Sequence, residues 1–401
     1  MNLADLNKVA EAMVSSGRGI LAADESSGTI KKRFDAIGVE STEDNRRDYR
    51  ELLFRSADAM NLGELNKVAT AMVAPGRGIL AADESTGTIK KRFDAIGVES
   101  TADHRRDYRE MLFRATEAMS KYISGVILYD ETIRQNAKDG TPLVKLIEKS
   151  GAIPGIKVDK GTKPLPFSPG EVITEGLDGL RERLVEYRGL GAKFAKWRAV
   201  IDIGPQIPSY AAIMTNAHAL ARYAAICQEE GIVPIVEPEV LMDGDHDADR
   251  CYLITEWMLR TVFEQLYYQK VALEGMVLKP NMVVAGKKAK KRAGVEEVAE
   301  KTVRLLKACV PAAVPGIAFL SGGQSDEEAT AHLDAINRLA GGCPWRITFS
   351  YGRALQAAPQ KAWVGKSENV AAAQRAFTHR AMMNGLASLG QWKQDLEKKA
   401  A

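Results

Sequence analysis

Residues 232–278 read IVPIVEPEVLMDGDHDADRCYLITEWMLRTVFEQLYYQKVALEGMVL and contain two short apolar runs separated by a longer amphipathic stretch. We predict strands over Ile232–Val236 and Met276–Leu278, because short runs rich in β-branched residues favour strands. The stretch Arg250–Leu273 carries apolar residues at helical spacing and is predicted to form a helix. Two strands joined by a helix of this length lie parallel in one sheet. This segment therefore predicts an α/β fold.

The same alternation of strand and helix recurs along the chain. Eight runs are predicted as strands: Gly78–Ala82, Gly125–Tyr129, Ile153–Val158, Ala192–Trp197, Ile232–Val236, Met276–Leu278, Gly316–Leu320 and Trp345–Phe349. Five of the stretches between them are predicted as helices: Asp178–Leu190, Ile213–Glu230, Arg250–Leu273, Glu296–Cys309 and Asp326–Leu339. Eight strand–helix units in one chain predict a single-domain TIM (β/α)8 barrel.

Composition excludes several classes of protein. The 55 Lys and Arg residues nearly balance the 52 Asp and Glu residues, which argues against a protein that binds nucleic acid through its overall charge. A hydrophobic content of 45% is too high for a disordered chain. No apolar run approaches the ~18 residues that a membrane span needs. The four cysteines lie far apart, which favours free thiols and a cytoplasmic location.

The front of the chain is duplicated. Residues 2–60 align without a gap with residues 61–119, and 12 of the 59 aligned positions differ. A barrel needs one copy, and the second runs directly into the predicted strand Gly125–Tyr129. We therefore predict a barrel domain over 60–395, a tail over 396–401, and a surplus first copy over 1–59. We expect that surplus copy to be loosely packed or exchanged between subunits.

Polar side chains follow or end every predicted strand. They are Asp83, Asp130, Glu131, Lys157, Asp159, Lys196, Arg198, Glu237, Glu239, Lys279, Ser321–Gly323 and Ser350–Arg353. Ionisable groups in buried parallel strands are unfavourable unless paired, and a single one would be explained by a structural ion pair. Because the carboxyl ends of all barrel strands meet at one mouth, a complete ring predicts an active site there.

Lys279 is the candidate nucleophile of this ring. It ends an apolar run and precedes a proline, and a lysine there can simply extend its ammonium group to water. In the alternative, burial and the neighbouring cations Lys157, Lys196 and Arg198 favour the neutral amine that attacks a carbonyl carbon. A Schiff base on Lys279 would then stabilise a carbanion on the substrate.

Glu237 and Glu239 are the candidate acid and base. Residues two apart on a strand share one face, so the two carboxyl groups can take opposite protonation states. Pro238 would stiffen the turn out of the strand. The alternative is an exposed acidic loop, since an acidic stretch follows. In the loops after the last two strands, Ser321, Gly322, Gly323, Ser350, Gly352 and Arg353 are predicted to bind a phosphate group.

Two charged segments suggest other functions. The acidic stretch 243–249 resembles a metal loop around His246 but lacks the terminal glutamate of a calcium loop, so an exposed loop is favoured. The basic run 287–292 would suit RNA or an anionic partner, although an exposed loop is again favoured.

The assembled residues resemble those of class I fructose-1,6-bisphosphate aldolases. The matching segments are LAADESTG (80–87), IKVDKG (156–161), AKWR (195–198), EPEV (237–240), LKPN (278–281), LSGGQS (320–325) and FSYGRALQ (349–356). The resemblance implies a metal-free and cofactor-free TIM-barrel lyase, usually a homotetramer. It implies reversible cleavage of fructose 1,6-bisphosphate into dihydroxyacetone phosphate and glyceraldehyde 3-phosphate, in glycolysis and gluconeogenesis.

The resemblance also implies individual roles. Lys279 would form the Schiff base, Glu237 would act as the general acid and base, and Glu239 would tune the amine. Asp83 would assist the carbon–carbon bond step and Lys196 would stabilise charge. Further residues would contact the substrate and its two phosphates: Lys157, Arg198, Ser85, Lys91, Arg92, Ser321, Gly322, Gly323, Ser350, Gly352 and Arg353.

Two features depart from this family. Many members end in a tyrosine that transfers a proton, whereas this chain reads QDLEKKAA at its end, which leaves the proton shuttle and the choice between bisphosphate and monophosphate open. The duplicated front is the second departure. The alternatives are another Schiff-base sugar-phosphate lyase or transaldolase, and a barrel scaffold that binds RNA or anionic partners.

Overall fold

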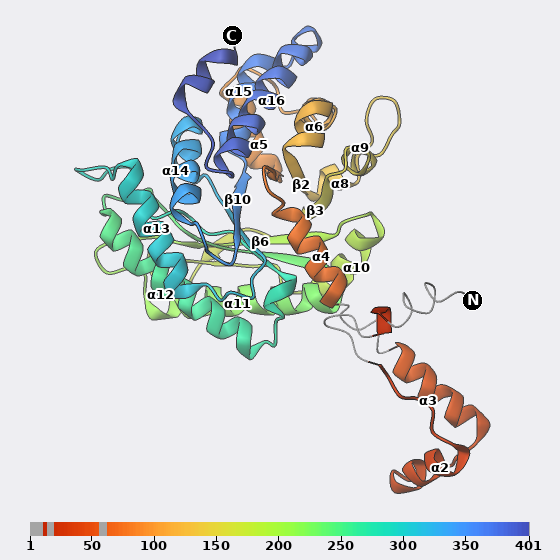
Figure 1. Ribbon diagram of the computed structural model, residues 1–401. Helices are drawn as coiled ribbons and strands as arrows, with labels where there is room; N and C mark the ends of the chain where they lie inside the picture. The colour runs from red at the N-terminus through yellow and green to blue at the C-terminus, as the bar shows by residue number, and fades with distance from the viewer. Residues whose placement is uncertain (1–10, 14–19, 56–61, 401) are drawn as a thin grey trace. The chain divides into compact units, whose positions relative to one another are not determined.

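The structure is a computed structural model that describes residues 11–13, 20–55 and 62–400. The chain divides into two compact units, 1–63 and 64–401, and each is described by itself. The second unit contains a closed barrel of eight parallel strands (Figure 1), which confirms the predicted fold class. In chain order the strands are β1 (Gly78–Ala82), β2 (Ile123–Leu128), β3 (Ile153–Lys157), β6 (Phe194–Ile201), β7 (Val233–Val240), β8 (Val277–Leu278), β9 (Gly316–Phe319) and β10 (Arg346–Tyr351).

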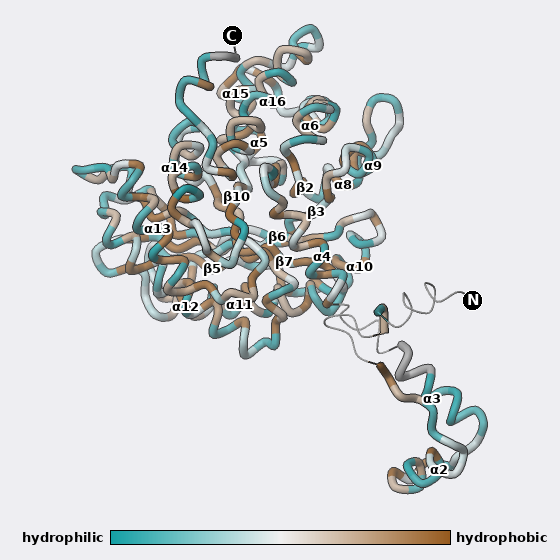
Figure 2. The backbone as a smooth tube through the Cα atoms, viewed as in Figure 1, coloured by the Kyte–Doolittle hydropathy of each residue, from teal (hydrophilic) through white to brown (hydrophobic). Residues whose placement is uncertain are grey.

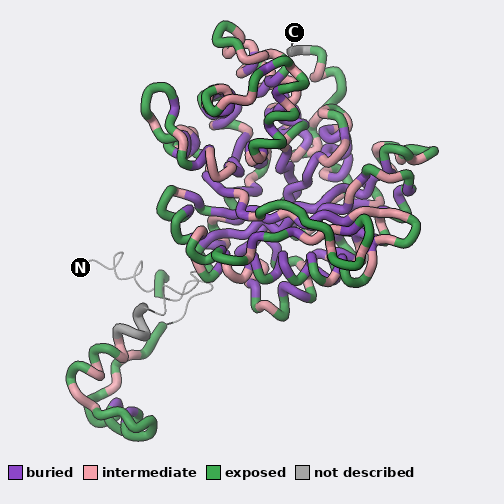
Figure 3. Tube along the Cα trace, turned by 180° about the vertical axis from the view of Figure 1, so that it is seen from behind, coloured by how far each residue is buried: buried purple, intermediate pink, exposed green. Residues whose placement is uncertain are grey.

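Helices surround this barrel. They are α4 (Leu62–Met72), α5 (Thr86–Asp94), α6 (Ala102–Phe113), α7 (Thr116–Lys121), α8 (Asp130–Ile133), α9 (Leu143–Lys149), α10 (Leu180–Gly189), α11 (Tyr210–Glu229), α12 (Ala248–Tyr268), α13 (Val295–Cys309), α14 (Asp326–Leu339), α15 (Arg353–Trp363) and α16 (Val370–Ala387), with 3-10 turns η2 (Leu273–Gly275), η3 (Ser367–Asn369) and η4 (Gln394–Ala400). The five predicted helices are confirmed to within a few residues, except that the third ends at Tyr268. Figure 2 shows apolar residues along the barrel strands, and Figure 3 shows that these strands are largely buried.

Alternation along the strands separates the barrel interior from the layer beneath the helices. On β6, Phe194 lies in the cluster inside the barrel, whereas Trp197 lies in the layer between strands and helices. The Phe194 ring fills space left by two glycines, because a Cβ on Gly155 would lie 2.3 Å from it and one on Gly125 3.0 Å. Leu65, Ala69 and Met72 of α4 belong to the same inner cluster, so α4 packs against the amino-terminal end of the barrel.

Two strands extend four residues beyond their predicted carboxyl ends. β6 continues to Ile201 and β7 to Val240, so Glu237, Pro238 and Glu239 lie within a strand instead of in a turn after it. Both strands remain paired over this extension, with Glu237 opposite Arg198 and Glu239 opposite Val200. The prediction ended the strands too early because charged residues were taken as strand ends, whereas their alternate side chains face the mouth of the barrel.

Two further features lie outside the predicted elements. A small antiparallel pair, β4 (Thr162–Pro164) and β5 (Val172–Thr174), projects after β3. At the carboxyl end, η4 begins at Gln394, and the Glu397 carboxylate accepts hydrogen bonds from Arg380 and from His379. Among the described residues, no helix is both long and apolar enough to cross a membrane.

The first unit repeats part of this structure locally. Helices α2 (Ser27–Ala36) and α3 (Glu43–Arg55) correspond to α5 and α6, and Phe34 packs edge-on against Tyr49 with ring centroids 5.5 Å apart. Residues 20–26 form neither helix nor strand, although the residues identical to 20–23, Ile79–Ala82, lie in β1 of the second copy. The side chain of Ile20 is 66% exposed, whereas that of Ile79 is fully buried.

Candidate active site

A polar cavity of about 400 Å³ lies at the carboxyl-terminal ends of the barrel strands. Strand alternation produces it, because residues that face inward below the mouth are apolar and residues that face inward at the mouth are charged. On β6 the inward series runs Phe194, Lys196, Arg198, and on β7 it runs Ile235, Glu237, Glu239. The bottom of the barrel is therefore packed, and its top is a charged pocket.

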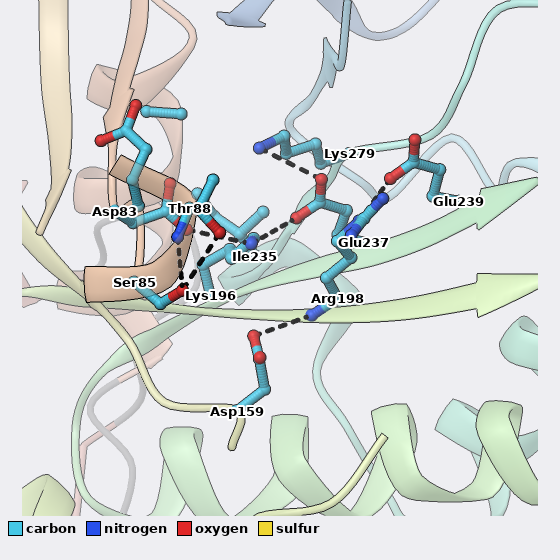
Figure 4. Close-up of polar contacts among 12 residues, drawn as sticks. Asp83, Ser85, Thr88, Asp159, Lys196, Arg198, Ile235, Glu237, Glu239 and Lys279 are labelled. Carbon is cyan, nitrogen blue, oxygen red and sulfur yellow. Dashed lines mark hydrogen bonds and ion pairs between the residues drawn. The ribbon is translucent and has the colours of Figure 1, made fainter. Parts of the chain in front are cut away.

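Four charged side chains form a continuous row across the cavity (Figure 4). Lys279 Nζ lies 3.2 Å from Glu237 Oε1, and Lys196 Nζ lies 3.0 Å from Glu237 Oε2. Lys196 also donates a hydrogen bond of 3.0 Å to Asp83 Oδ2. Lys196, Glu237 and Lys279 are buried, so these charges compensate one another in a site with little access to water.

This arrangement stabilises the charged forms of Asp83 and Lys196. Burial by itself would raise the pKa of Asp83, but Lys196, Lys157 and Lys279 together hold it well below the ordinary value for aspartate. Burial would likewise lower the pKa of Lys196, but Asp83 and Glu237 raise it above the ordinary value for lysine. Asp83 is therefore a carboxylate and Lys196 an ammonium near neutral pH.

A second ion pair flanks the row. Arg198 donates a short hydrogen bond from Nε to the Glu239 carboxylate, and its backbone N–H lies 3.4 Å from Asp159 Oδ2. Burial alone would lower the pKa of Arg198, but Glu239 raises it. Arg198 therefore remains a fixed cation beside the row of charges.

One side of the cavity is formed by the loops after β9 and β10. Gly322 adopts φ +54°, a conformation that favours glycine, and Arg353 donates hydrogen bonds to the carbonyl oxygens of Gly322 (2.8 Å) and Gln324 (2.7 Å). The hydroxyl group of Ser350 is buried and has no hydrogen-bond partner among the described residues. Gly352 precedes α15, so the amino-terminal end of that helix faces this side. These groups suit an anion.

The opposite side is formed by the start of α5 and the end of β3. Ser85 caps α5 and its hydroxyl oxygen lies 3.1 Å from that of Thr88. The ammonium group of Lys157 lies 5.0 Å from the centre of the Tyr129 ring. Arg92 pairs with the buried carboxylate of Glu84. Cations therefore line both ends of the cavity, which suits a ligand with an anionic group at each end.

Fourteen of the sixteen predicted site residues line this cavity: Asp83, Ser85, Arg92, Lys157, Lys196, Arg198, Glu237, Glu239, Lys279, Ser321, Gly322, Ser350, Gly352 and Arg353. Lys91 and Gly323 do not. Lys91 is exposed on α5, where neighbouring residues point in directions about 100° apart, so of these two neighbours Arg92 faces the cavity and Lys91 does not. Gly323 instead packs against Lys287, whose Cε would lie 2.1 Å from a Cβ at that position.

The prediction missed four polar or glycine residues of the lining: Glu84, Thr88, Gly161 and Thr162. Asp159, which was predicted in the ring of polar strand ends but given no role of its own, also lines the cavity. Thr162 begins β4, which no sequence pattern indicated. Among the described residues, no three or more His, Cys, Asp or Glu side chains are grouped so that they would hold a metal ion.

Comparisons with known proteins identify the family. The profile described as "Fructose-bisphosphate aldolase class-I" matches residues 5–62 and 64–401, so both copies of the duplicated front are matched. A "Probable fructose-bisphosphate aldolase class 1" of Xanthomonas campestris pv. campestris is 59% identical over 335 residues, which cover 83% of this chain and 100% of the relative. A "Fructose-bisphosphate aldolase" of Drosophila melanogaster is 55% identical over 82% of this chain and 91% of the relative.

A solved structure is similar as well. The fructose-bisphosphate aldolase of Plasmodium falciparum, solved in complex with TRAP and a small-molecule inhibitor, superposes with a TM-score of 0.81 at 49% identity. The superposition covers 83% of this chain and 96% of the other. With a closed parallel barrel, a charged mouth and matches over nearly the whole sequence, the chain belongs to the class I fructose-bisphosphate aldolases.

Proposed function

We propose that this aldolase cleaves fructose 1,6-bisphosphate through a Schiff base on Lys279, in glycolysis and gluconeogenesis, without a metal ion or cofactor. The observation that carries this proposal is the buried row Lys279–Glu237–Lys196–Asp83, with successive separations of 3.2, 3.0 and 3.0 Å. It supplies a nucleophile, an acid–base group beside it and a carboxylate on the far side of a cation.

The first stage joins substrate and enzyme. The Lys279 amine attacks the keto carbon of the sugar, and the carbinolamine then loses water to form an iminium ion. Glu237 is near enough to Lys279 to accept the proton from nitrogen and to donate one to the departing hydroxyl group. Glu239 pairs with Arg198, which keeps this cation in the lining of the same cavity.

The second stage breaks the carbon–carbon bond. The Asp83 carboxylate takes the proton of the hydroxyl group on carbon 4, the bond between carbons 3 and 4 breaks, and its electron pair moves to the iminium ion to give an enamine. Lys196 keeps Asp83 ionised for this step. Glyceraldehyde 3-phosphate leaves, and protonation of the enamine followed by hydrolysis releases dihydroxyacetone phosphate and restores Lys279.

Substrate orientation follows from the two ends of the cavity. Ser321, Gly322, Ser350, Gly352 and Arg353 would bind the phosphate of the dihydroxyacetone half. At the other end, Ser85, Arg92, Lys157 and Arg198 would bind the glyceraldehyde phosphate half, with Lys91 and Gly323 outside the cavity lining. Binding at both ends places carbon 2 near Lys279 in the middle.

Borohydride trapping tests this proposal. Borohydride added with fructose 1,6-bisphosphate should reduce the iminium ion and leave a stable adduct on the peptide that contains Lys279, detected by mass spectrometry. The Lys279→Met variant should show neither adduct nor cleavage. An adduct on another lysine, or loss of cleavage on adding a chelator, would refute the proposal. Products other than the two triose phosphates would indicate a different Schiff-base lyase.

We also propose a cytoplasmic homo-oligomer, by family resemblance a tetramer. Large apolar side chains exposed on the barrel unit support this proposal: Phe167, Tyr210, Leu253, Tyr267 and Tyr268. We expect no membrane or nucleic-acid partner. In the basic run 287–292, Lys287 is paired with Asp243 and Arg292 with Glu328, which reduces the charge available to RNA. Light scattering after size exclusion would give the number of subunits.

A further inference from the structure

In the barrel unit, one surface binds residues 79–114 of the second copy. We propose that residues 20–55 of the first copy can bind this same surface, and that they do so when the second copy is excluded from it. The barrel would then contain Asp24 in the position of Asp83. The proposal concerns a binding surface of the barrel and a partner within the same chain.

The surface is built mainly by residues outside the duplication. Strand β1 lies between β2 and β10, so two strands receive it. Gln356 donates hydrogen bonds of 2.7 Å to the Ala81 carbonyl oxygen and to Glu84, and accepts one of 3.1 Å from Tyr108. Trp363 packs against Phe93, with ring centroids 5.6 Å apart. Glu131 accepts hydrogen bonds from Arg105 and lies 3.7 Å from Arg109.

Every one of these contacting side chains exists in the first copy. At the constant offset of 59, Glu84, Phe93, Arg105, Tyr108 and Arg109 correspond to identical residues. The equivalents are Glu25, Phe34, Arg46, Tyr49 and Arg50.

Most differences between the copies lie away from this surface; the exception among the contacts to Trp363 is His104, whose ring centroid lies 6.4 Å from that of Trp363 and which corresponds to Asn45. Of the 12 positions that differ, eight are exposed in the second copy, two are partly buried and two are buried. The two buried differences are small, since Met111 corresponds to Leu52 and Ala115 to Ser56. The first copy therefore retains the buried side chains almost unchanged.

The first copy also has the helical conformation that the surface requires. The Phe34–Tyr49 pair has an interplanar angle of 86°, and the Phe93–Tyr108 pair has one of 89°. Ser26 caps α2 as Ser85 caps α5. What the first copy lacks is the strand: Ile20 and Leu21 are 66% and 57% exposed, whereas Ile79 and Leu80 are fully buried. Insertion would bury these two side chains.

Connectivity explains why the second copy occupies the surface in the parent chain. If the first copy were inserted, the 59 residues of the second copy would form a loop whose ends meet beside β2. The probability of closing a loop falls as the 3/2 power of its length, so a loop of this length disfavours the arrangement by roughly 450-fold. The first copy should therefore be almost absent from the barrel until the second is blocked.

Gly78 provides the block. A Cβ on Gly78 would lie 2.6 Å from both the ring and the carbonyl oxygen of Phe349, so the Gly78→Val variant cannot place β1 beside β10. The equivalent Gly19→Val substitution in the first copy is the matched control. The Gly19→Val/Gly78→Val double variant blocks both copies. All three are made in the full chain.

Hydrogen exchange read by mass spectrometry distinguishes the copies, because Ser27 and Thr86 give otherwise similar peptides different masses. The parent and Gly19→Val chains should protect the amides of 79–85. The Gly78→Val chain should instead protect those of 20–26 and unfold at a lower temperature than the parent. The double variant should protect neither segment. In the Gly78→Val chain, protection of neither segment would overturn the proposal, and so would protection of 79–85.

The activity measurement rests on the proposed function, whereas the exchange measurement does not. Gly78→Val should keep cleavage activity within about tenfold of the parent, because the inserted copy supplies the same side chains, and adding Asp24→Ala should remove that activity. If protection moves to 20–26 but the activity of Gly78→Val does not depend on Asp24, the proposed role of Asp83 would be refuted. The proposal that the first copy binds the barrel would still hold. Transfer that depends on protein concentration and doubles the mass would show insertion between two chains and overturn the proposal.

Discussion

Replacing Lys196 by methionine tests whether the buried row of charges is built around this cation. Methionine keeps most of the length of the side chain and removes its charge. Lys196 is 5% exposed and lies 3.0 Å from both Asp83 and Glu237, so the substitution leaves the buried Glu237 and the partly buried Asp83 without their shared partner. Glu237 still has Lys279 at 3.2 Å, but Asp83 loses its hydrogen-bonded cation.

Breaking a buried ion pair from one side typically lowers stability by about 3–5 kcal/mol. We expect the free energy of unfolding of Lys196→Met to fall by about this amount at pH 8. We also expect kcat to fall by roughly 10²–10³, because the cation that stabilises charge at the reacting centre is gone.

The loss of stability should depend on pH with a defined sign. In the parent, the pKa of Asp83 is lowered in the folded state, so its contribution to stability is complete above the ordinary value of 3.8 and is lost only below it. Without Lys196, we expect burial to outweigh the remaining cations Lys157 and Lys279 and so to raise the pKa of Asp83 in the folded state. The penalty is then largest at high pH and shrinks as pH falls and Asp83 takes up a proton.

Urea unfolding at pH 8 and pH 5 measures this effect. The difference between parent and Lys196→Met should be smaller at pH 5. The control is Lys145→Met, which removes an exposed pair with Glu148 and should change stability by at most ~1 kcal/mol at either pH. If Lys196→Met were no more destabilising than the control, or if the difference did not change with pH, the assignment of Lys196 as the central cation would be wrong.

Four further variants test other parts of the structure. Asp83→Ala should lower cleavage by roughly 10²–10³ while Asp24→Ala leaves it nearly unchanged in steady-state assays, and the opposite pattern would place the first copy in the active barrel. Phe194→Ala should destabilise the protein by about 3–5 kcal/mol in urea unfolding, because the ring is fully buried and fills the barrel interior; a change under ~1 kcal/mol would contradict that packing. Arg353→Ala should raise KM for fructose 1,6-bisphosphate by at least about tenfold, since a charge-assisted hydrogen bond contributes about 1.5–3 kcal/mol, and an unchanged KM would remove Arg353 from phosphate binding.

Local patterns in the sequence determined most of the architecture. All eight barrel strands were predicted because each combines apolar or β-branched residues with a polar end. The eightfold repeat supports the fold even where the bounds of a single strand are wrong. The same logic found Lys279 and the Glu237–Glu239 pair, since inward-facing positions at the mouth of a barrel are set by a period of two. Most of the cavity lining therefore followed from strand ends and from family resemblance.

Bounds and packing partners were harder to predict. The charged residues Glu237 and Glu239 led to a predicted end of β7 that is too early. A strand can continue through charged residues when the neighbouring strand supplies a suitable partner, and the pairing of Glu237 with Arg198 is visible only in the structure. Thr162 and Glu84 enter the cavity through contacts between segments that are distant in the sequence. Nothing in their local sequence distinguishes them from surface residues.

The duplicated segment separates the two kinds of information. In both copies the sequence alone determined the helices, their serine caps and the packing of phenylalanine on tyrosine, because those interactions join residues close together in the chain. The strand was decided only by tertiary structure: Ile79–Ala82 is buried between β2 and β10, whereas the identical Ile20–Ala23 has no strand partner among the described residues. A helix satisfies its backbone hydrogen bonds within itself, while a strand needs neighbours that the rest of the fold must provide.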